Sequence, residues 1–118
     1  MRFIAEHVSF QETDDVWTFA LGDNAVDQPD NWIILTFGDE EEQDCQLGLT
    51  GLYLQTSDGL QGYGLVKQLT MLSQSLLIEL IEEAKTIVLE IPAQHLETAK
   101  TAAEACELAN STQSRKQA

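Results

Sequence analysis

Apolar and polar residues alternate along most of residues 1–91, which is the spacing of half-buried β-strands. In Val16–Leu21 this alternation places Trp17, Phe19 and Leu21 on one face of a predicted strand. Trp32–Phe37 is nearly continuously apolar, as expected of a strand that is covered on both faces near the centre of a sheet. The residues between these strands, 22–31, are rich in turn formers and predict a loop.

The next strands are predicted from turn residues as well as from alternation. Asp58-Gly59 is typical of a hairpin turn, and it would join Tyr53–Thr56 to Leu60–Gly64. Before this hairpin the alternating leucines change parity at Thr50-Gly51, which favours a β-bulge. Further strands are predicted at Leu65–Leu72, Leu76–Ile81 and Ile87–Ile91, with turns at Ser73–Ser75 and Glu82–Lys85.

Residues 77–89 also fit a single helix, but the alternation and the β-branched residues favour two strands. After Pro92 the spacing becomes helical, and residues 93–110 are rich in the helix formers Ala, Glu and Lys. One stripe of this predicted helix has mostly small side chains, which allow close packing on a sheet: Leu96, Ala99, Ala103 and Cys106.

These elements predict an α+β fold, with one antiparallel β-sheet of about six to seven strands and one C-terminal helix packed on it. Residues 1–110 would form a single domain, and the polar residues 111–118 a flexible tail.

Charge is the unusual feature of the composition. The chain has 20 acidic and 6 basic residues, a formal net charge of −14. From Phe3 to Val66 there is no Lys or Arg, while 13 of the acidic residues lie there. Such a field repels nucleic acid and anionic membranes and attracts cationic ligands or proteins, although acidity also serves solubility alone.

No stretch approaches the length of about 20 apolar residues that spans a bilayer, and the first ten residues do not resemble a signal peptide. We therefore expect a soluble, cytoplasmic protein. Its two cysteines, Cys45 and Cys106, are then expected to be reduced thiols.

The most acidic stretch is Asp39–Asp44, in which five of six residues are carboxylates. It directly follows the predicted central strand. A solvated turn, a cation site and a contact surface for a cationic partner are all compatible with it. Asp39, Glu41 and Gln43 alternate like the start of a calcium loop, but Asp44 and Thr50 replace the Gly and Glu that such a loop needs at its sixth and twelfth positions. We expect no metal and no other cofactor.

Catalysis is not indicated by any motif. The only histidines, His7 in a predicted edge strand and His95 in the first helical turn, have no recognisable nucleophile partner. Gly59–Gly64, GLQGYG, resembles a glycine-rich nucleotide-binding loop, but a hairpin follows it rather than a helix. Acidic neighbours disfavour the thiolate of Cys45. We predict no catalytic residues.

Two short motifs resemble those of the immunity protein 10 family of bacterial polymorphic toxin systems. The first is the run Glu42-Gln43-Asp44 followed, two residues later, by Leu47-Gly48; the second is Tyr63-Gly64 and Val66. Leu65 replaces a glycine that the family usually has. Thr50 and Leu52 stand where the family often has Asp and Tyr. The resemblance covers about Ile33–Ile81.

This resemblance implies a non-catalytic immunity protein that binds and neutralises a cognate toxin domain, which the acidic surface suggests is basic. The expected partner-binding residues are Asp39, Glu40, Glu41, Glu42 and Asp44. A structural role is expected for the other motif residues, Gln43, Leu47, Gly48, Tyr63, Gly64 and Val66.

Two alternatives remain open. The chain could be a small acidic ligand- or cation-binding module without catalysis. It could also form a homodimer, in which an exposed N-terminal edge strand pairs between two copies.

Overall fold

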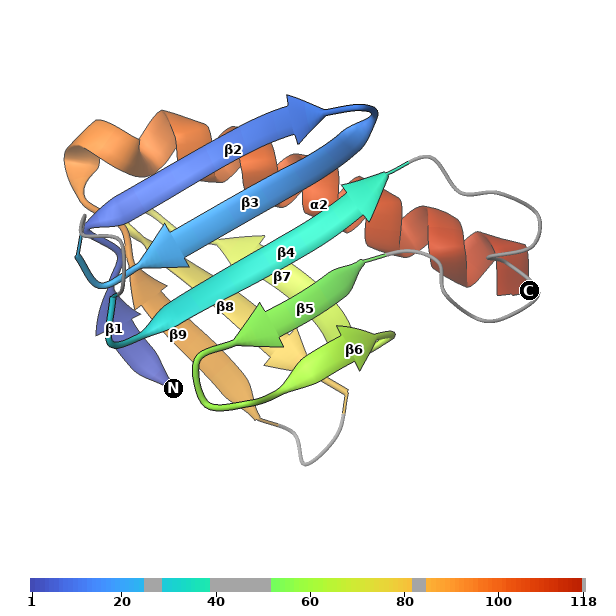
Figure 1. Ribbon diagram of the computed structural model, residues 1–118, viewed down its shortest axis with the longest axis horizontal. Helices are drawn as coiled ribbons and strands as arrows, with labels where there is room; N and C mark the ends of the chain where they lie inside the picture. The colour runs from blue at the N-terminus through green and yellow to red at the C-terminus, as the bar shows by residue number, and fades with distance from the viewer. Residues whose placement is uncertain (25–28, 39–51, 82–84, 118) are drawn as a thin grey trace.

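The computed structural model describes residues 1–24, 29–38, 52–81 and 85–117, the last seven as backbone only (Figure 1). It has the predicted α+β architecture, with mainly antiparallel strands and one long C-terminal helix. The nine strands of the described residues are β1 (Arg2–Ile4), β2 (His7–Thr13), β3 (Val16–Gly22), β4 (Trp32–Gly38), β5 (Tyr53–Thr56), β6 (Gln61–Tyr63), β7 (Val66–Met71), β8 (Ser75–Leu80) and β9 (Thr86–Glu90).

The strands form two sheets, whereas the sequence predicted one. The five-stranded sheet has the order β2-β3-β4-β5-β6 and is antiparallel throughout. The four-stranded sheet has the order β1-β9-β8-β7, with β1 parallel to β9. The chain passes from one sheet to the other between Tyr63 and Val66, where Gly64 has a φ of +70°. A positive φ at this step turns the chain out of the first sheet, and strand spacing alone does not encode that turn.

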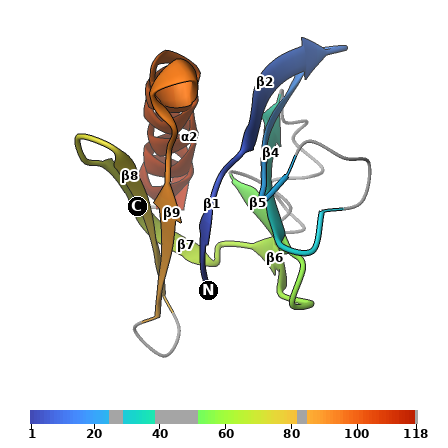
Figure 2. The same cartoon turned by 90° about the vertical axis from the view of Figure 1, so that its left-hand side faces the viewer.

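Helix α2 (Leu96–Gln117) follows a short 3-10 helix, η2 (Ala93–His95), that begins after Pro92. It continues past the predicted end at Asn110. Figures 1 and 2 show α2 and the four-stranded sheet side by side, both on the same face of the five-stranded sheet. The molecule is therefore built of two layers, and the small side chains of α2, which include Ala99, Ala103 and Cys106, are buried between them.

The predicted strands are largely confirmed. β4 lies at the centre of its sheet, and the hairpin at Asp58-Gly59 joins β5 to β6, with a positive φ at Gly59. Residues 77–89 contribute two strands, as the alternation indicated. The inward face of the five-stranded sheet supplies much of the core, including Phe19, Leu21, Ile33, Leu35 and Leu54.

Three sequence predictions lie outside the described residues. These are the bulge at Thr50-Gly51, the two leucines that precede it, and most of the turn at Glu82–Lys85. The single-domain boundaries, 1–110 and 111–118, stay predictions.

Candidate functional site

The acidic run begins at one end of the five-stranded sheet. Gly38 is the last residue of β4, and Asp39 is the next residue in the chain. All the predicted partner-binding residues, Asp39–Asp44, lie outside the described residues, as do the motif residues Gln43, Leu47 and Gly48. The structure describes only the end of β4, the strand that precedes this run in the sequence.

Two further carboxylates lie at that same end. Gly38 pairs with Val16, the first residue of β3, so it lies beside the turn that joins β2 to β3. This turn has only two residues, Asp14 and Asp15, with φ values of 52° and 67°. Two-residue hairpin turns with two positive φ angles usually contain Asn-Gly or Asp-Gly, because other side chains are strained there.

The turn therefore holds an unusual residue pair. Asp15 occupies a position that glycine fits better, and the two exposed carboxylates repel each other. Neither effect stabilises the fold. Asp14 and Asp15 were not predicted as site residues from the sequence, although the two-residue interval between alternating segments indicates a tight turn there.

Gly38 fixes the approach of β4 to this turn. A Cβ atom at this position would lie 2.7 Å from the backbone carbonyl oxygen of Asp15, closer than such atoms can approach. Only glycine fits without movement of the backbone. The close approach places Gly38, the residue before the acidic run, against the β2–β3 turn.

A partly exposed tryptophan lies beside these carboxylates. Trp17 is stacked between Phe10, at a ring-centroid distance of 5.0 Å, and Phe37, at 6.5 Å. It shares the inward face with Phe19 and Leu21, as predicted, but it lies near the end of the strand and is 39% exposed. A stacked, partly exposed indole two residues from the Asp14-Asp15 turn resembles the aromatic anchors of protein interfaces.

The motif residues of the described chain take different positions. Val66 is buried, and its carbonyl oxygen accepts a hydrogen bond of 3.1 Å from the side-chain amide of Asn110. Gly64 is exposed and turns the chain between the sheets. Tyr63 is 38% exposed and makes an edge-to-face contact with Tyr53, at a centroid distance of 4.8 Å.

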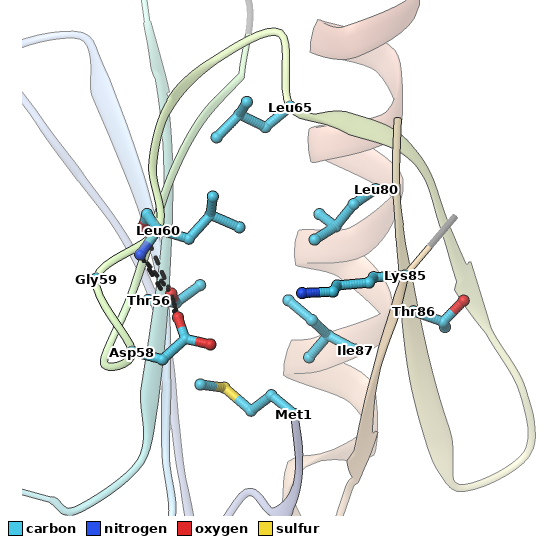
Figure 3. Close-up of a pocket in the computed structure, with 10 residues that line it drawn as sticks. All are labelled: Met1, Thr56, Asp58, Gly59, Leu60, Leu65, Leu80, Lys85, Thr86 and Ile87. Atoms are coloured by element: carbon cyan, nitrogen blue, oxygen red, sulfur yellow. Dashed lines mark hydrogen bonds between the residues drawn. The ribbon is translucent and has the colours of Figure 1, made fainter. Parts of the chain in front are cut away.

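A second candidate site is a cleft of about 680 Å³ between the sheets (Figure 3). The β5–β6 hairpin, with Asp58 and Leu60, forms one wall, and the other includes Lys85 and Ile87. The full lining is Met1, Thr56, Asp58, Gly59, Leu60, Leu65, Leu80, Lys85, Thr86 and Ile87. The hydroxyl of Thr56 donates to the Asp58 carboxylate, and this hydrogen bond is the main cause that lowers the pKa of that carboxyl.

The described residues offer little reactive chemistry. Cys106 is buried in the core, and burial, with the nearby Glu107 carboxylate, raises the pKa of its thiol to about 12. Its thiolate is therefore scarce at neutral pH. His95 contacts the backbone carbonyl oxygen of Glu6 at 3.1 Å, which ties the start of the helical region to the connection between β1 and β2.

Within the described ranges, no three His, Cys, Asp or Glu side chains gather where they could hold a metal ion. The residues considered for a calcium-like loop, Asp39, Glu41 and Gln43, lie outside those ranges. None of the helices described here is long and apolar enough to cross a membrane.

Together, the two-layer fold and the acidic, aromatic sheet end define a small acidic α+β protein suited to binding another macromolecule. The model of the family "Immunity protein 10" matches residues 4–108. The chain therefore belongs to the Immunity protein 10 family, as its motifs implied, and the match extends well beyond Ile33–Ile81. A search of curated proteins found no match. The family's name implies an immunity protein with a toxin as its partner, and it suggests a non-enzymatic role.

Proposed function

We propose that this protein is a non-catalytic immunity protein of a bacterial polymorphic toxin system, which acts in the cytoplasm. It binds a cognate toxin domain with a basic surface and neutralises it by occupying that surface. The contact surface includes Asp39, Glu40, Glu41, Glu42 and Asp44, together with the turn carboxylates Asp14 and Asp15. We also propose that residues 1–110 form its single domain.

The observation that carries this proposal is that Gly38, the last residue before the acidic run, lies against a turn with two carboxylates. The Asp14-Asp15 turn lies against Gly38, from which the acidic run starts, and no Lys or Arg occurs between Phe3 and Val66. An uncompensated acidic surface accelerates association with a basic partner and suppresses binding to anionic ones. Toxins that act on nucleic acid need a basic surface to neutralise phosphates, and such a surface would fit this one.

The test begins with the tagged full-length chain as bait in lysate of its source organism at low salt. Bound proteins are eluted with increasing salt and identified by mass spectrometry. Each captured domain is then expressed alone and together with this chain. The proposal expects one basic domain that arrests growth when alone and is harmless with the chain. If no captured domain is toxic, or if the chain fails to restore growth, the proposal is wrong.

The cleft between the sheets favours a second candidate, a small acidic ligand-binding module. Its volume of about 680 Å³ falls in the range of small-molecule pockets, and it combines apolar walls with the Asp58 carboxylate and the Lys85 side chain. A ligand that binds only the folded state raises the melting temperature. A panel of metabolites and divalent cations that leaves the melting temperature unchanged removes this candidate.

A further inference from the structure

The outward face of the five-stranded sheet has an unusual composition. The side chains on this face alternate with the buried ones, and the ladder places them in rows such as Thr18, Thr36, Tyr53 and Tyr63. Within β2 to β6, no position on this face is Asp, Glu, Lys or Arg. Both α2 and the four-stranded sheet pack on the opposite face (Figures 1 and 2).

The other sheet provides an internal comparison. Its outward face carries Arg2, Glu79 and Glu90, and Arg2 lies 3.9 Å from the Glu90 carboxylate. Charged residues make up 22% of the chain, so their absence from one broad face is not a property of the whole composition. An exposed sheet face in a soluble protein normally carries charged side chains, which resist aggregation.

On the outward face of the five-stranded sheet, aromatic and aliphatic side chains occupy the positions where charged ones would be expected. Tyr53 and Tyr63 form an edge-to-face pair on this face, and Ile34 lies half-buried in the neighbouring row. Trp32 is also half-buried and points the same way, since it pairs with Gly22 at the end of the ladder. Tyr and Trp are enriched at the centres of protein interfaces, because they supply large contact areas at low entropic cost.

Carboxylates surround this face at both ends of the sheet. Asp14 and Asp15 occupy the β2–β3 turn at one end, and Asp30 lies in the β3–β4 connection at the other. No Lys or Arg of the sequence lies between Arg2 and Lys67, so none of these connections contributes a Lys or Arg charge. A centre without charge and a charged rim is the usual anatomy of a protein interface, and here the rim has one sign.

We infer that the outward face of the five-stranded sheet is the surface that docks the toxin domain, by contact of Tyr53, Tyr63 and Ile34 with an apolar patch ringed by Lys and Arg. This inference rests on the proposed function and deepens it, because it extends the contact from the acidic end across the sheet. The acidic rim guides the partner and aligns it, and the uncharged centre provides most of the buried area. A rim of this sign repels nucleic acid and anionic lipid.

The test measures the affinity of the full chain for the toxin domain identified by capture and growth arrest. Gln61→Lys adds a positive charge to the proposed face, at an exposed strand position opposite Gln55. Gln68→Lys makes the same change at an exposed position on the outward face of the other sheet, opposite Glu79. We expect Gln61→Lys to raise the dissociation constant about tenfold or more, and Gln68→Lys to leave the constant within about twofold of the wild-type value. Tyr63→Ala should raise the dissociation constant at least as much as Gln61→Lys does.

Each result separates the inference from the proposed function. Melting temperatures of all variants confirm first that they are folded. If the wild-type chain neutralises the toxin and both Gln61→Lys and Tyr63→Ala bind as tightly as it does, the face is not the docking surface, while the proposed function stands. Equal weakening by Gln61→Lys and Gln68→Lys also overturns the inference, because net charge alone would then explain the loss. A chain that binds no toxin domain overturns both.

A second copy of the chain is the competing occupant, and sedimentation of the chain alone tests it. The inference expects a monomer with and without Tyr63→Ala. A wild-type dimer that Tyr63→Ala converts to a monomer would assign the face to self-association and overturn the docking of a toxin.

Discussion

The side-chain amide of Asn110 donates a hydrogen bond of 3.1 Å to the backbone carbonyl oxygen of Val66. Val66 begins β7, the edge strand of the four-stranded sheet, and the carboxylate of Glu107 accepts from the backbone N–H of Leu69 in the same strand. Helix α2 thus satisfies backbone groups that an open edge would expose. It also closes that edge against pairing with another chain. The family motif residue Val66 lies at this junction.

This relationship predicts that Asn110→Ala lowers the free energy of unfolding by about 1–2 kcal/mol, since it leaves a partly buried carbonyl without its donor. Chemical denaturation followed by tryptophan fluorescence measures the change. Thr101→Ala, at an exposed position of the same helix, is the control and should change stability by less than about 0.5 kcal/mol. Equal effects of the two substitutions would contradict the edge-closing role.

A second prediction concerns the hairpin between β5 and β6. The Thr56 hydroxyl donates to Asp58, and it also accepts a hydrogen bond of 3.2 Å from the backbone N–H of Leu60. Thr56→Val keeps the shape and removes these bonds, so it should cost about 1 kcal/mol at pH 7. It should also raise the pKa of Asp58 toward 3.8, the ordinary value.

The sign of the pH dependence follows from the lowered pKa. A carboxyl whose pKa is lowered in the folded state adds stability above its unfolded value, and this stability is lost as the pH falls through the folded pKa. The difference in stability between wild type and Thr56→Val should therefore be full above about pH 5 and narrow below about pH 4. Denaturation at several pH values and NMR titration of Asp58 check this. A difference in stability that becomes larger at acidic pH would contradict the lowered pKa of Asp58.

Alternation and turn residues in the sequence were sufficient to predict most strands, because burial on one face imposes a period of two. The division into two sheets was not predictable in this way. It depends on the turn through Gly64 and on the pairing of β1 with β9, whose paired residues are 86 positions apart in the sequence. For the candidate site, the motifs predicted the family, but the β2–β3 turn comes next to Gly38, the residue before the acidic run, only through the ladder pair Val16–Gly38.

The turn itself gives a prediction in which stability and binding oppose each other. Replacing Asp14 and Asp15 by Asn and Gly supplies the residues that a turn with two positive φ angles prefers. We expect this double variant to be more stable by about 1 kcal/mol and to associate more slowly with the toxin domain. Thermal melting and stopped-flow association measure the two effects.

The matched control removes two carboxylates elsewhere. Glu97 and Glu104 both lie in α2, on the opposite side of the five-stranded sheet from the proposed docking face, and both are exposed. The double variant Glu97→Gln, Glu104→Gln has the same net charge as the turn variant. It should slow association less, because charge near the contact surface has the largest effect at physiological salt. If both double variants slow association equally, the turn has no special place in the interface.

Cys106 gives a prediction that requires no partner. Its thiol is buried in the core, and its pKa of about 12 leaves almost no thiolate at pH 8. In a Cys45→Ser variant, iodoacetamide should not modify the native protein within hours but should modify it within minutes in denaturant. Mass spectrometry distinguishes the modified protein from the unmodified one. Rapid modification under native conditions would show that the interface between α2 and the five-stranded sheet opens readily.

The last prediction concerns the acidic run, which follows Gly38 at the end of β4. Replacing Asp39, Glu40 and Glu41 by Ser removes three negative charges from the surface proposed to meet a basic toxin. Long-range attraction acts mainly before contact, so association should slow by about tenfold or more at low salt, while dissociation changes by less than about threefold.

Salt provides the internal control for this last variant. Screening shortens the range of the attraction, so the difference in association rate between wild type and the triple variant should shrink as ionic strength rises from about 0.01 to 0.15 M. Stopped-flow fluorescence measures association. If the rates are equal at low salt, these residues do not guide the partner, and the acidic run is a solvated turn, although the immunity role itself survives. A variant that alters only dissociation would instead assign the run to direct, short-range contacts in the complex.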